Sequence, residues 1–416
     1  MKLEFGYDNT VQSVDVPAEK VLKVLMSNEM IHERRGTAAV EYALANPLGS
    51  EKLCELVAPG MKTVIVTSDI SRPLPSYDVI PSVLNELNKG GVEDKDITVV
   101  FALGSHRNHT EEEKKHLAGP EVYGRVRCED SNETGFVHMG DTSAGTPVDI
   151  CRRVAEADFK ICLGNVEFHY FAGYSGGYKA VMPGCSTVAA IQKNHTKMVS
   201  TDAHAGRLEG NPVREDIEEA GRICGVDFIV NAVLSEHKEI VYAAAGDAVT
   251  AHRDACAYLD RMYRCRIPAR ADIVIVSQGG APKDANLYQV QKALDNSKHA
   301  VKDGGTVILV GSCAEGFGSK KFEDWLMEAE SPHSLVERIG EHFELGGHKA
   351  AAIGMVLEKA DIYLVSEMPD DVVKSIFMTP FKSVEDAYAA AVKKHGPGAT
   401  VIAMPFGGAT LPCMKQ

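Results

Sequence analysis

One glycine-rich segment holds the residues whose types are best suited to chemistry. Residues 165–184, NVEFHYFAGYSGGYKAVMPG, place one histidine, His169, and one lysine, Lys179, among five aromatic residues. The glycines between them let the backbone approach a ligand closely. A lysine flanked by Tyr178 and Ala180 can be partly desolvated, which would lower its pKa and make its amine a nucleophile. The alternative is a surface lysine whose stem lies along an apolar wall, which is the commoner arrangement.

A second candidate is His195, in the predicted helix Ser186–Met198 that follows this segment. The helical repeat puts His195 on the same face as Val188 and Ile191. A histidine on an apolar face is usually a core residue, but its imidazole can also hold a soft or borderline metal ion. One histidine does not hold a metal alone, and no second His or Cys stands at helical or CxxC spacing. Any metal here therefore needs ligands from outside the ordinary side chains.

Two polar turns follow predicted strands. In SDISRP, Arg72 offers a planar fork for a carboxylate or phosphate, and Asp69 suits a ribose hydroxyl or an arginine partner. The alternative is an aspartate that stabilises the turn beside Pro73. In GSHR, His106 is a candidate acid/base because the pKa of histidine lies near neutral pH; it can equally be a solvated loop residue.

The second half of the chain contributes one further group of polar residues. The segment PKDANLYQVQKAL places Tyr288 and Lys292 four residues apart on a predicted helix, with Gln289 beside them. These side chains can face a neighbouring site or simply water. The glycine-rich turns SQGG and EGFG match neither a Walker nor a dinucleotide fingerprint, so they are weak phosphate signals.

The sequence predicts that strands and helices alternate along the chain and position these residues. Short apolar, β-branched runs typical of buried parallel strands each end in one of the polar or glycine-rich turns. They lie at residues 63–66, 97–100, 157–163, 273–276, 307–310, 362–365 and 401–403. Helical patterns between them include Asp78–Lys89, Thr110–Leu117 and Val213–Cys224, the last with Asn211 as N-cap. This alternation predicts an α/β fold in which ligands bind beyond the carboxyl ends of the strands.

The length of the chain predicts two or three domains, and the pattern of strands favours two. A boundary is expected near Pro268, where proline and charge interrupt the pattern. We expect two α/β domains with largely parallel sheets, residues 1–268 and 269–416, with the active site in the cleft between them. The first 50 or so residues read as part of the first domain, with a strand-like Lys2–Phe5 and a helix over Thr37–Ala45. The last residues can pack back on the first domain.

Composition excludes several classes. The 44 basic and 58 acidic residues leave a net charge of −14, which argues against a nucleic-acid partner. No apolar run reaches 18 residues, which argues against a membrane span, and no signal-peptide stretch opens the chain, which predicts a cytoplasmic protein. The ten cysteines form no CxxC pair, which weakens zinc-ribbon and iron–sulfur interpretations and favours reduced thiols.

Taken together, these motifs resemble the nickel-pincer-dependent lactate racemase family. The match runs in order through SDISRP, GSHR, EFHYFAGYSGGYKAVMPG, the helix with Asn194 and His195, and GGAPKDANLYQVQKAL. The resemblance implies a pyridinium mononucleotide with two sulfur-bearing arms, linked covalently to Lys179, with nickel held by His195 as the one protein ligand. It also implies cofactor-biosynthesis enzymes as partners. The residues matching the cofactor site are Lys179, Asp69, Tyr174, Ser175, Gly176 and Gly177.

The family reaction inverts the C2 carbon of a 2-hydroxy carboxylic acid by reversible hydride transfer to the cofactor, through a 2-keto acid. The resemblance implies that His106 and His169 are its two acid/bases. It further implies a carboxylate clamp of Arg72 and Lys292, supported by hydrogen bonds from Tyr288 and Gln289.

One departure concerns the substrate. The lactate enzyme has a tryptophan near the substrate methyl group, whereas the only tryptophan here, Trp325, does not align with it. The corresponding region is GGHKAAAIG, where His348 and Lys349 leave room and hydrogen bonds for a longer substrate. We therefore expect His348 to contact the substrate, which would be a sugar acid, malate or another 2-hydroxy acid rather than lactate.

Two other functions fit the same architecture. A nicotinamide-dependent 2-hydroxy acid dehydrogenase would use histidine and arginine similarly, but it should have a GxGxxG turn after an early strand, and none is found. A non-catalytic two-domain anion-binding protein would need neither Lys179 nor His195.

Overall fold

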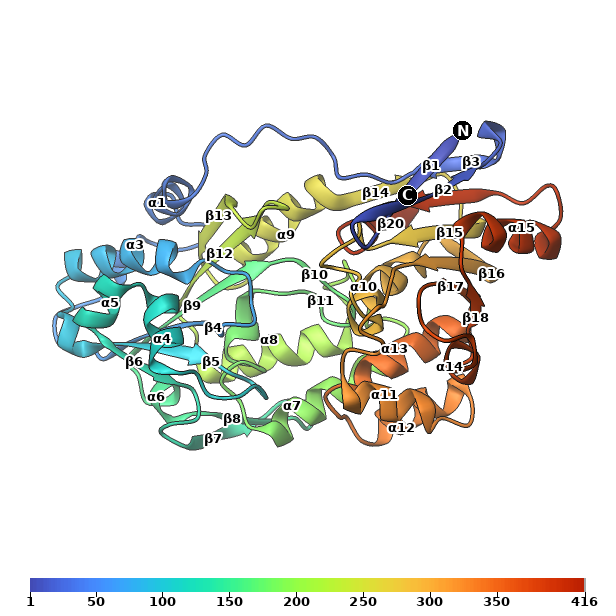
Figure 1. The fold of residues 1–416 in the computed structure, drawn as a ribbon. Helices are drawn as coiled ribbons and strands as arrows, with labels where there is room; N and C mark the ends of the chain where they lie inside the picture. The colour runs from blue at the N-terminus through green and yellow to red at the C-terminus, as the bar shows by residue number, and fades with distance from the viewer. Residues whose placement is uncertain (415–416) are drawn as a thin grey trace. The chain divides into compact units, whose positions relative to one another are not determined.

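The computed structural model describes residues 1–414, which form two compact units (Figure 1). The central unit is Met30–Asp260, and the terminal unit combines Met1–Glu29 with the chain from Arg261 onward. This division differs from the expected 1–268 and 269–416 at the amino terminus. The physical reason is a strand pairing: β3 (Val21–Val24) runs parallel to β19 (Val401–Met404) at the edge of the terminal unit's sheet.

The central unit is built on a six-stranded sheet in the order β13-β12-β9-β4-β5-β6. Its strands are parallel except for β13, which is antiparallel to β12. Their bounds are β4 Thr63–Ser68, β5 Ile97–Ala102, β6 Arg127–Asp130, β9 Phe159–Val166, β12 Phe228–Leu234 and β13 Ile240–Gly246. The runs TVIVTS and FKICLGNV are almost continuously apolar because helices or turns cover both faces of these strands.

Two kinds of cover complete the central unit. Helices α1 (Thr37–Ala45) and α3 (Ser76–Lys89) pack against one face of the sheet, in a core that includes Ile65, Val99 and Ile161. The short 3-10 turn Gly177–Ala180 packs against strand β9 of the sheet. Helix α8 (Pro212–Cys224) packs against the same turn. The unit therefore places the glycine-rich segment between its sheet and α8.

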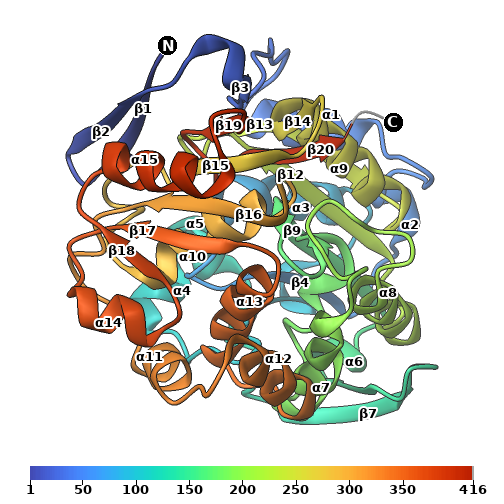
Figure 2. The same cartoon turned by 90° about the vertical axis from the view of Figure 1, so that its right-hand side faces the viewer.

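The terminal unit has an all-parallel sheet in the order β18-β17-β16-β15-β19-β3. The bounds of its other strands are β15 Ala271–Ser277, β16 Val301–Val310, β17 Asp361–Val365 and β18 Thr379–Phe381. The hairpin of β1 (Lys2–Tyr7) and β2 (Thr10–Asp15) shares a core with α15 (Val384–His395) on one face of this sheet (Figure 2). Helices α10 (Leu287–Ser297) and α13 (Gly347–Leu357) contact its strands as well as each other.

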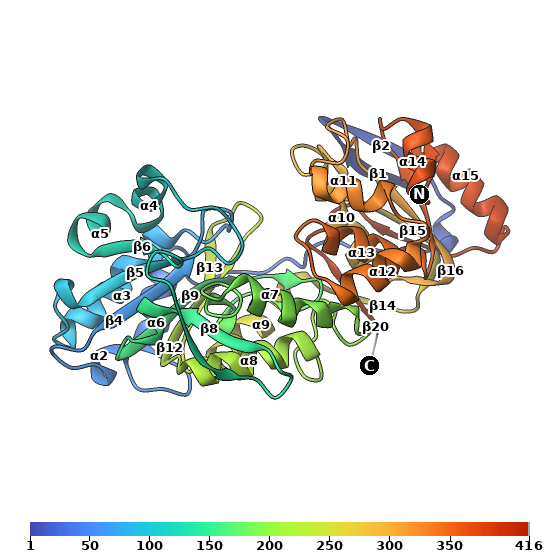
Figure 3. The ribbon, with the colours of Figure 1, turned by 90° about the horizontal axis from the view of Figure 1, so that it is seen from below.

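The remaining elements connect these layers. The last described strand, β20 (Leu411–Met414), pairs with β14 (Arg264–Ile267) within the terminal unit. The other helices and strands are α2 Leu53–Leu56, α4 Glu111–Ala118, α5 Pro120–Arg125, β7 Phe136–Asp141, β8 Pro147–Cys151, α6 Arg152–Ala155, β10 Phe168–His169, β11 Gly173–Tyr174, α7 Val188–His195, α9 Thr250–Tyr263, α11 Lys320–Met327, α12 Pro332–Glu341 and α14 Asp370–Ser375 (Figure 3). Among the described residues, none of the helices has the length and apolar character that crossing a membrane requires.

The predicted helices around the site agree with the structure, apart from one boundary. Asn211 caps α8 as expected, since its side chain accepts hydrogen bonds from the backbone N–H groups of Val213 and Arg214 at 3.1 and 3.2 Å. The predicted helix Ser186–Met198 is shorter: α7 begins after Thr187, whose hydroxyl caps it, and ends at His195 before a 3-10 turn.

Candidate functional site

The polar turns of the central unit meet at one edge of its sheet. Strand β4 lies between β9 and β5, and the three are parallel, so their carboxyl ends are neighbours. Asp69 follows β4 directly, His106 lies in the turn after β5, and His169 comes soon after β9. This is the edge at which open parallel sheets bind ligands.

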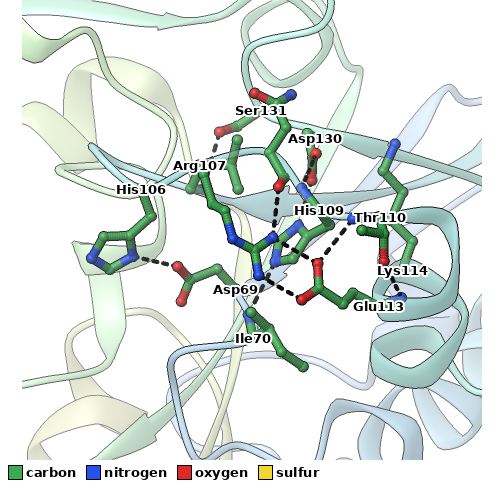
Figure 4. A network of polar contacts seen from close by, with 12 residues as sticks. Asp69, Ile70, His106, Arg107, His109, Thr110, Glu113, Lys114, Asp130 and Ser131 are labelled. Atoms are coloured by element: carbon green, nitrogen blue, oxygen red, sulfur yellow. Dashed lines mark hydrogen bonds and ion pairs between the residues drawn. The ribbon is translucent and has the colours of Figure 1, made fainter.

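Asp69 and His106 form a hydrogen-bonded pair at this edge. Asp69 is 3% exposed, and its carboxylate accepts hydrogen bonds from the hydroxyl of Ser71 at 2.7 Å and from Nδ1 of His106 (Figure 4). Burial acts to raise the pKa of Asp69, but the hydrogen bonds from His106 and Ser71 outweigh it, so this pKa is lowered. The anionic carboxylate fixes the imidazole through Nδ1, which assigns any proton transfer by His106 to Nε2.

A buried relay holds the turn that carries Asp69. The backbone N–H of Ile70 donates to Nε2 of His109 at 3.0 Å, and Nδ1 of His109 donates to the carboxylate of Asp130 at 2.6 Å (Figure 4). Because Nε2 accepts, the ring proton of His109 lies on Nδ1. Asp130 ends β6, so the relay ties the turn to the neighbouring sheet edge. No motif of the sequence points to His109, although it stands three residues after His106.

The backbone of Arg72 is held in the turn, while its guanidinium has no partner within residues 1–414. Its backbone N–H donates to the carbonyl of Asp69 at 3.1 Å, which closes the turn. Its side chain is exposed, and within residues 1–414 the guanidinium makes no hydrogen bond or ion pair. This planar fork can therefore bind a carboxylate or phosphate.

Residues 171–179 form a loop that follows β9 in the chain and is called here the attachment loop. Gly176 has a positive φ of 77°, and a Cβ at this position would lie 2.8 Å from the side-chain oxygen of Asn231. The backbone N–H of Gly177 donates to that same oxygen at 2.9 Å. Only glycine fits this close approach at residue 176.

Two residues predicted to bind the cofactor shape this loop from within. The hydroxyl of Ser175 donates to the carbonyl of Asn165 at 2.8 Å and accepts from the N–H of Glu167 at 2.9 Å. Tyr174 is 2% exposed, and its hydroxyl donates to Asp260 at 2.7 Å. These contacts explain why the loop needs both side chains.

Asn211, the N-cap of α8, and Arg214, in its first turn, bind backbone carbonyls of the loop. Asn211 donates to the carbonyl of Phe171 at 2.8 Å, and Arg214 donates to the carbonyls of Ala172, Tyr174 and Gly176. The sequence predicts Asn211 only as a helix cap and gives no sign of the role of Arg214. Nothing in a single sequence marks an arginine whose partners are backbone carbonyls.

The loop presents Lys179 in a desolvated, positively charged setting. Its ammonium nitrogen lies 5.9 Å from the ring centroid of Phe171. Burial, then the charges of Arg214 and Arg72, lower the pKa of Lys179 well below its ordinary value, with Glu167 acting in the opposite direction. A lowered pKa makes the amine of a lysine more available as a nucleophile. Lys179 is half-buried, and the role predicted for it stays a prediction.

His169 is neutral in this setting. Burial lowers its pKa well below the ordinary value, and the charges of Lys179, His195 and Arg72 add to this effect. The backbone N–H of Ala172 donates to Nδ1 of His169 at 3.2 Å, so the ring proton lies on Nε2. His169 can therefore donate a hydrogen bond without carrying charge.

His195 is held in the tautomer that metal binding through Nε2 requires. It is 8% exposed, and its Nδ1 donates to the side-chain oxygen of Asn194 at 2.9 Å. The amide of Asn194 is oriented in turn, because its nitrogen donates to Asp216 at 2.7 Å and to the carbonyl of Val213 at 3.2 Å. The lone pair of His195 consequently lies on Nε2. Its ring also packs edge-on against Phe171 at 4.9 Å between centroids.

The donor set decides which kind of metal site fits. Within the described chain, no three His, Cys, Asp or Glu residues are grouped so that they could hold a metal ion. A metal at His195 would therefore need ligands from outside these side chains. The residues present fit a cofactor that brings its own donors.

The predicted substrate residues of the terminal unit lie on α10 and α13. Gln289 and Lys292 are exposed on α10, and the side chain of Lys292 makes no hydrogen bond or ion pair within residues 1–414. The ring of Tyr288 lies 4.0 Å from the ammonium nitrogen of Lys349, which donates to the carbonyl of Tyr288 at 2.7 Å. The structure thus brings Tyr288 together with Lys349.

His348 and Lys349 are both buried at the start of α13, at 8% and 6% exposure. Burial, then the charge of Lys349, lowers the pKa of His348 to about 3, so its ring is neutral. Its Nδ1 accepts from the N–H of Gly346 at 3.0 Å. Burial, then the charge of Lys292, lowers the pKa of Lys349 to about 7.

Comparisons with known proteins show the family of this chain. Residues 7–206 match the family described as "Lactate racemase N-terminal domain", and residues 267–411 match "Lactate racemase C-terminal domain". The chain is 31% identical to the lactate racemase of Thermoanaerobacterium thermosaccharolyticum, over 94% of each chain. It is 30% identical to the lactate racemase of Lactiplantibacillus plantarum, over 97% of this chain and 98% of that one.

Solved structures give the same picture of the fold. The lactate racemase apoprotein of T. thermosaccharolyticum has a TM-score of 0.89 at 30% identity, covering 99% of this chain and 100% of that chain. A Thermotoga maritima protein has a TM-score of 0.60 at 18% identity, covering 91% of this chain and 97% of that one. The second likeness concerns the fold alone.

Proposed function

This chain belongs to the lactate racemase family and is an isomerase, and from that premise we propose that it inverts the C2 carbon of a 2-hydroxy acid. The observation that carries the proposal is the arrangement around Phe171. The amine of Lys179 lies 5.9 Å from the centroid of this ring, and the imidazole of His195 packs on the same ring at 4.9 Å. An attachment lysine and a metal-ligand histidine thus share one aromatic neighbour.

The residues present fit a nickel-pincer nucleotide linked to Lys179. Lys179 would offer its amine, whose pKa is lowered by burial and by nearby positive charge, for the covalent link; His195 would offer Nε2 to nickel, with the other ligands supplied by the nucleotide. Asp69 would lie near its ribose, and Gly176 and Gly177 let the loop that carries Lys179 pack closely against Asn231 and His252. When bound, this group supplies a hydride acceptor, which inversion through a planar 2-keto acid requires. Enzymes that make the cofactor would be partners of this chain.

The two site histidines would have different roles: His106 would accept a proton, and His169 would donate a hydrogen bond. His106 is fixed by Asp69 through Nδ1 and would accept the proton of the substrate 2-hydroxyl at Nε2. His169 is neutral with its proton on Nε2, so it would donate a hydrogen bond to the same oxygen when that oxygen is a carbonyl. Inversion of the opposite enantiomer requires the two histidines to exchange these roles.

Two cationic residues, Arg72 and Lys292, would bind the substrate carboxylate. Arg72 has an unused guanidinium, and Lys292 on α10 is likewise without an ion pair in the described chain. Tyr288 and Gln289 would add hydrogen bonds. The polar pair His348 and Lys349 favours a sugar acid, malate or another 2-hydroxy acid over lactate.

Mass and metal analysis tests the proposal directly. The full chain is produced alongside cofactor-making enzymes, and intact mass and nickel content are measured for the natural protein and for Lys179→Ala and His195→Ala. We expect a Lys179 adduct and one nickel in the natural protein, no adduct in Lys179→Ala, and an adduct without nickel in His195→Ala. A natural protein with neither adduct nor nickel would contradict the proposal. A panel of chiral 2-hydroxy acids then identifies the substrate.

A further inference from the structure

Arg214 is a buried cation at the start of α8, with 1% exposure. Its Nε donates to the carbonyl of Ala172 at 3.1 Å, its Nη1 to that of Gly176 at 3.5 Å, and its Nη2 to that of Tyr174. Within residues 1–414 it makes no ion pair with a carboxylate. Glu218, the acid whose charge acts most on Arg214, is itself paired with Arg253 at 2.8 Å.

The three carbonyls belong to alternate residues of the attachment loop. A guanidinium holds its five N–H donors in one rigid plane, so a single side chain can fix the direction of the backbone from residue 172 to residue 176. A lysine at position 214 would keep the charge, but its donors radiate from one nitrogen atom and match this geometry poorly. The loop thus depends on the shape of the arginine as well as on its charge.

The same guanidinium dominates the charges around Lys179. The charged and titratable groups that act on Lys179 or respond to it are Arg72, Arg214, Glu167, His169 and His252. They come from the turns after β4 and β9, from α8 and from α9. After burial, Arg214 has the largest influence on the pKa of Lys179, and it acts to lower it.

We propose that Arg214 is a positioning residue for cofactor attachment, a role that rests on the function proposed for Lys179. Its guanidinium fixes the carbonyls of residues 172–176 and puts a permanent positive charge behind the attachment lysine. The first effect sets where the amine lies, and the second lowers the pKa of the amine. One buried side chain thereby prepares the loop before any cofactor arrives.

The test uses the full cofactor-free chain and two readouts. Pulse labelling with acetic anhydride, followed by peptide mass spectrometry, gives the pH midpoint at which Lys179 becomes reactive. Hydrogen exchange gives the protection of the amides of residues 171–177. In Arg214→Met, we expect the midpoint to rise by about one pH unit and exchange to accelerate. In Arg214→Lys, which keeps the charge, we expect the natural midpoint together with accelerated exchange.

Arg153→Met is the matched control, because Arg153 pairs with Glu129 at 2.8 Å and is absent from the loop's contacts. It should leave both readouts unchanged. A folded Arg214→Met with the natural midpoint and natural exchange would overturn the proposal. If Arg214→Met fails to fold by circular dichroism, natural exchange of residues 171–177 in Arg214→Lys would overturn it. Absence of a Lys179 adduct in cofactor-loaded protein would contradict the proposed function instead, since the labelling needs no cofactor.

Discussion

Asn194 and His195 are neighbours in sequence that also bond through their side chains, with 2.9 Å between the amide oxygen and Nδ1. The amide is held by Asp216, which is 3% exposed and accepts further hydrogen bonds from Thr142 at 2.5 Å and Thr146 at 2.8 Å. A buried carboxylate on α8 therefore sets the tautomer of an imidazole at the end of α7. Arrangements of this kind orient metal-ligating histidines.

The first prediction concerns that amide. Asn194→Ala should lower nickel retention about 10- to 100-fold, because His195 loses the partner that keeps its proton on Nδ1. The Lys179 adduct should remain, since Asn194 does not contact the attachment loop. Nickel per adduct, measured by elemental analysis and intact mass after dialysis against a chelator, checks this. Lys193→Ala, an exposed change on the same helix, is the control, and equal nickel in both variants would refute the prediction.

The second prediction concerns the pair of Asp69 and His106. Asp69→Asn keeps the shape of the side chain but removes the charge that orients and supports the imidazole, so kcat should fall about 100-fold or more. KM should change much less, because Arg72 and its turn remain. Steady-state kinetics in both directions of the reaction measure this. Ser71→Ala, which removes only the weaker partner of Asp69, should cost far less; equal losses in the two variants would contradict the assigned role.

The sequence pointed to candidate site residues more readily than to the residues and strand pairings that hold them in place. Lys179, His195 and Asp69 were visible because side-chain type and position after a strand carry information. Arg214 was invisible because its partners are carbonyls that are shaped by folding, and every residue has a carbonyl. The pairing of β3 with β19 was equally hidden, since it joins segments from opposite ends of the chain and depends on the edge of a completed sheet.

The third prediction concerns the relay under the Asp69 turn. His109→Phe removes both hydrogen bonds of the ring. The N–H of Ile70 then loses its acceptor, and the buried carboxylate of Asp130 loses a donor. The free energy of unfolding should fall by about 3 kcal/mol. Urea denaturation followed by circular dichroism measures the change. His116→Phe on the exposed face of α4 is the control, and a loss below about 1 kcal/mol in His109→Phe would show that the relay contributes little.

The fourth prediction concerns Lys349 and pH. Its pKa is about 7 in the folded chain, against an ordinary value of 10.5, so between these values the unfolded state binds more protons. Stability of the terminal unit should therefore rise with pH over this window. Lys349→Met removes a buried charge at the expense of one hydrogen bond to Tyr288, so it should stabilise this unit by about 1–3 kcal/mol at pH 6.

The stabilisation by Lys349→Met should shrink as pH approaches 10, where the folded protein already holds this lysine neutral. Trp325 is the only tryptophan and is buried in the terminal unit, so its fluorescence during urea denaturation reports on this unit. Lys320→Met, at an exposed position, should leave the pH dependence unchanged. If Lys349→Met were destabilising by the same amount at pH 6 and pH 9.5, the ammonium would contribute through its hydrogen bond alone, and the charge-based prediction would be wrong.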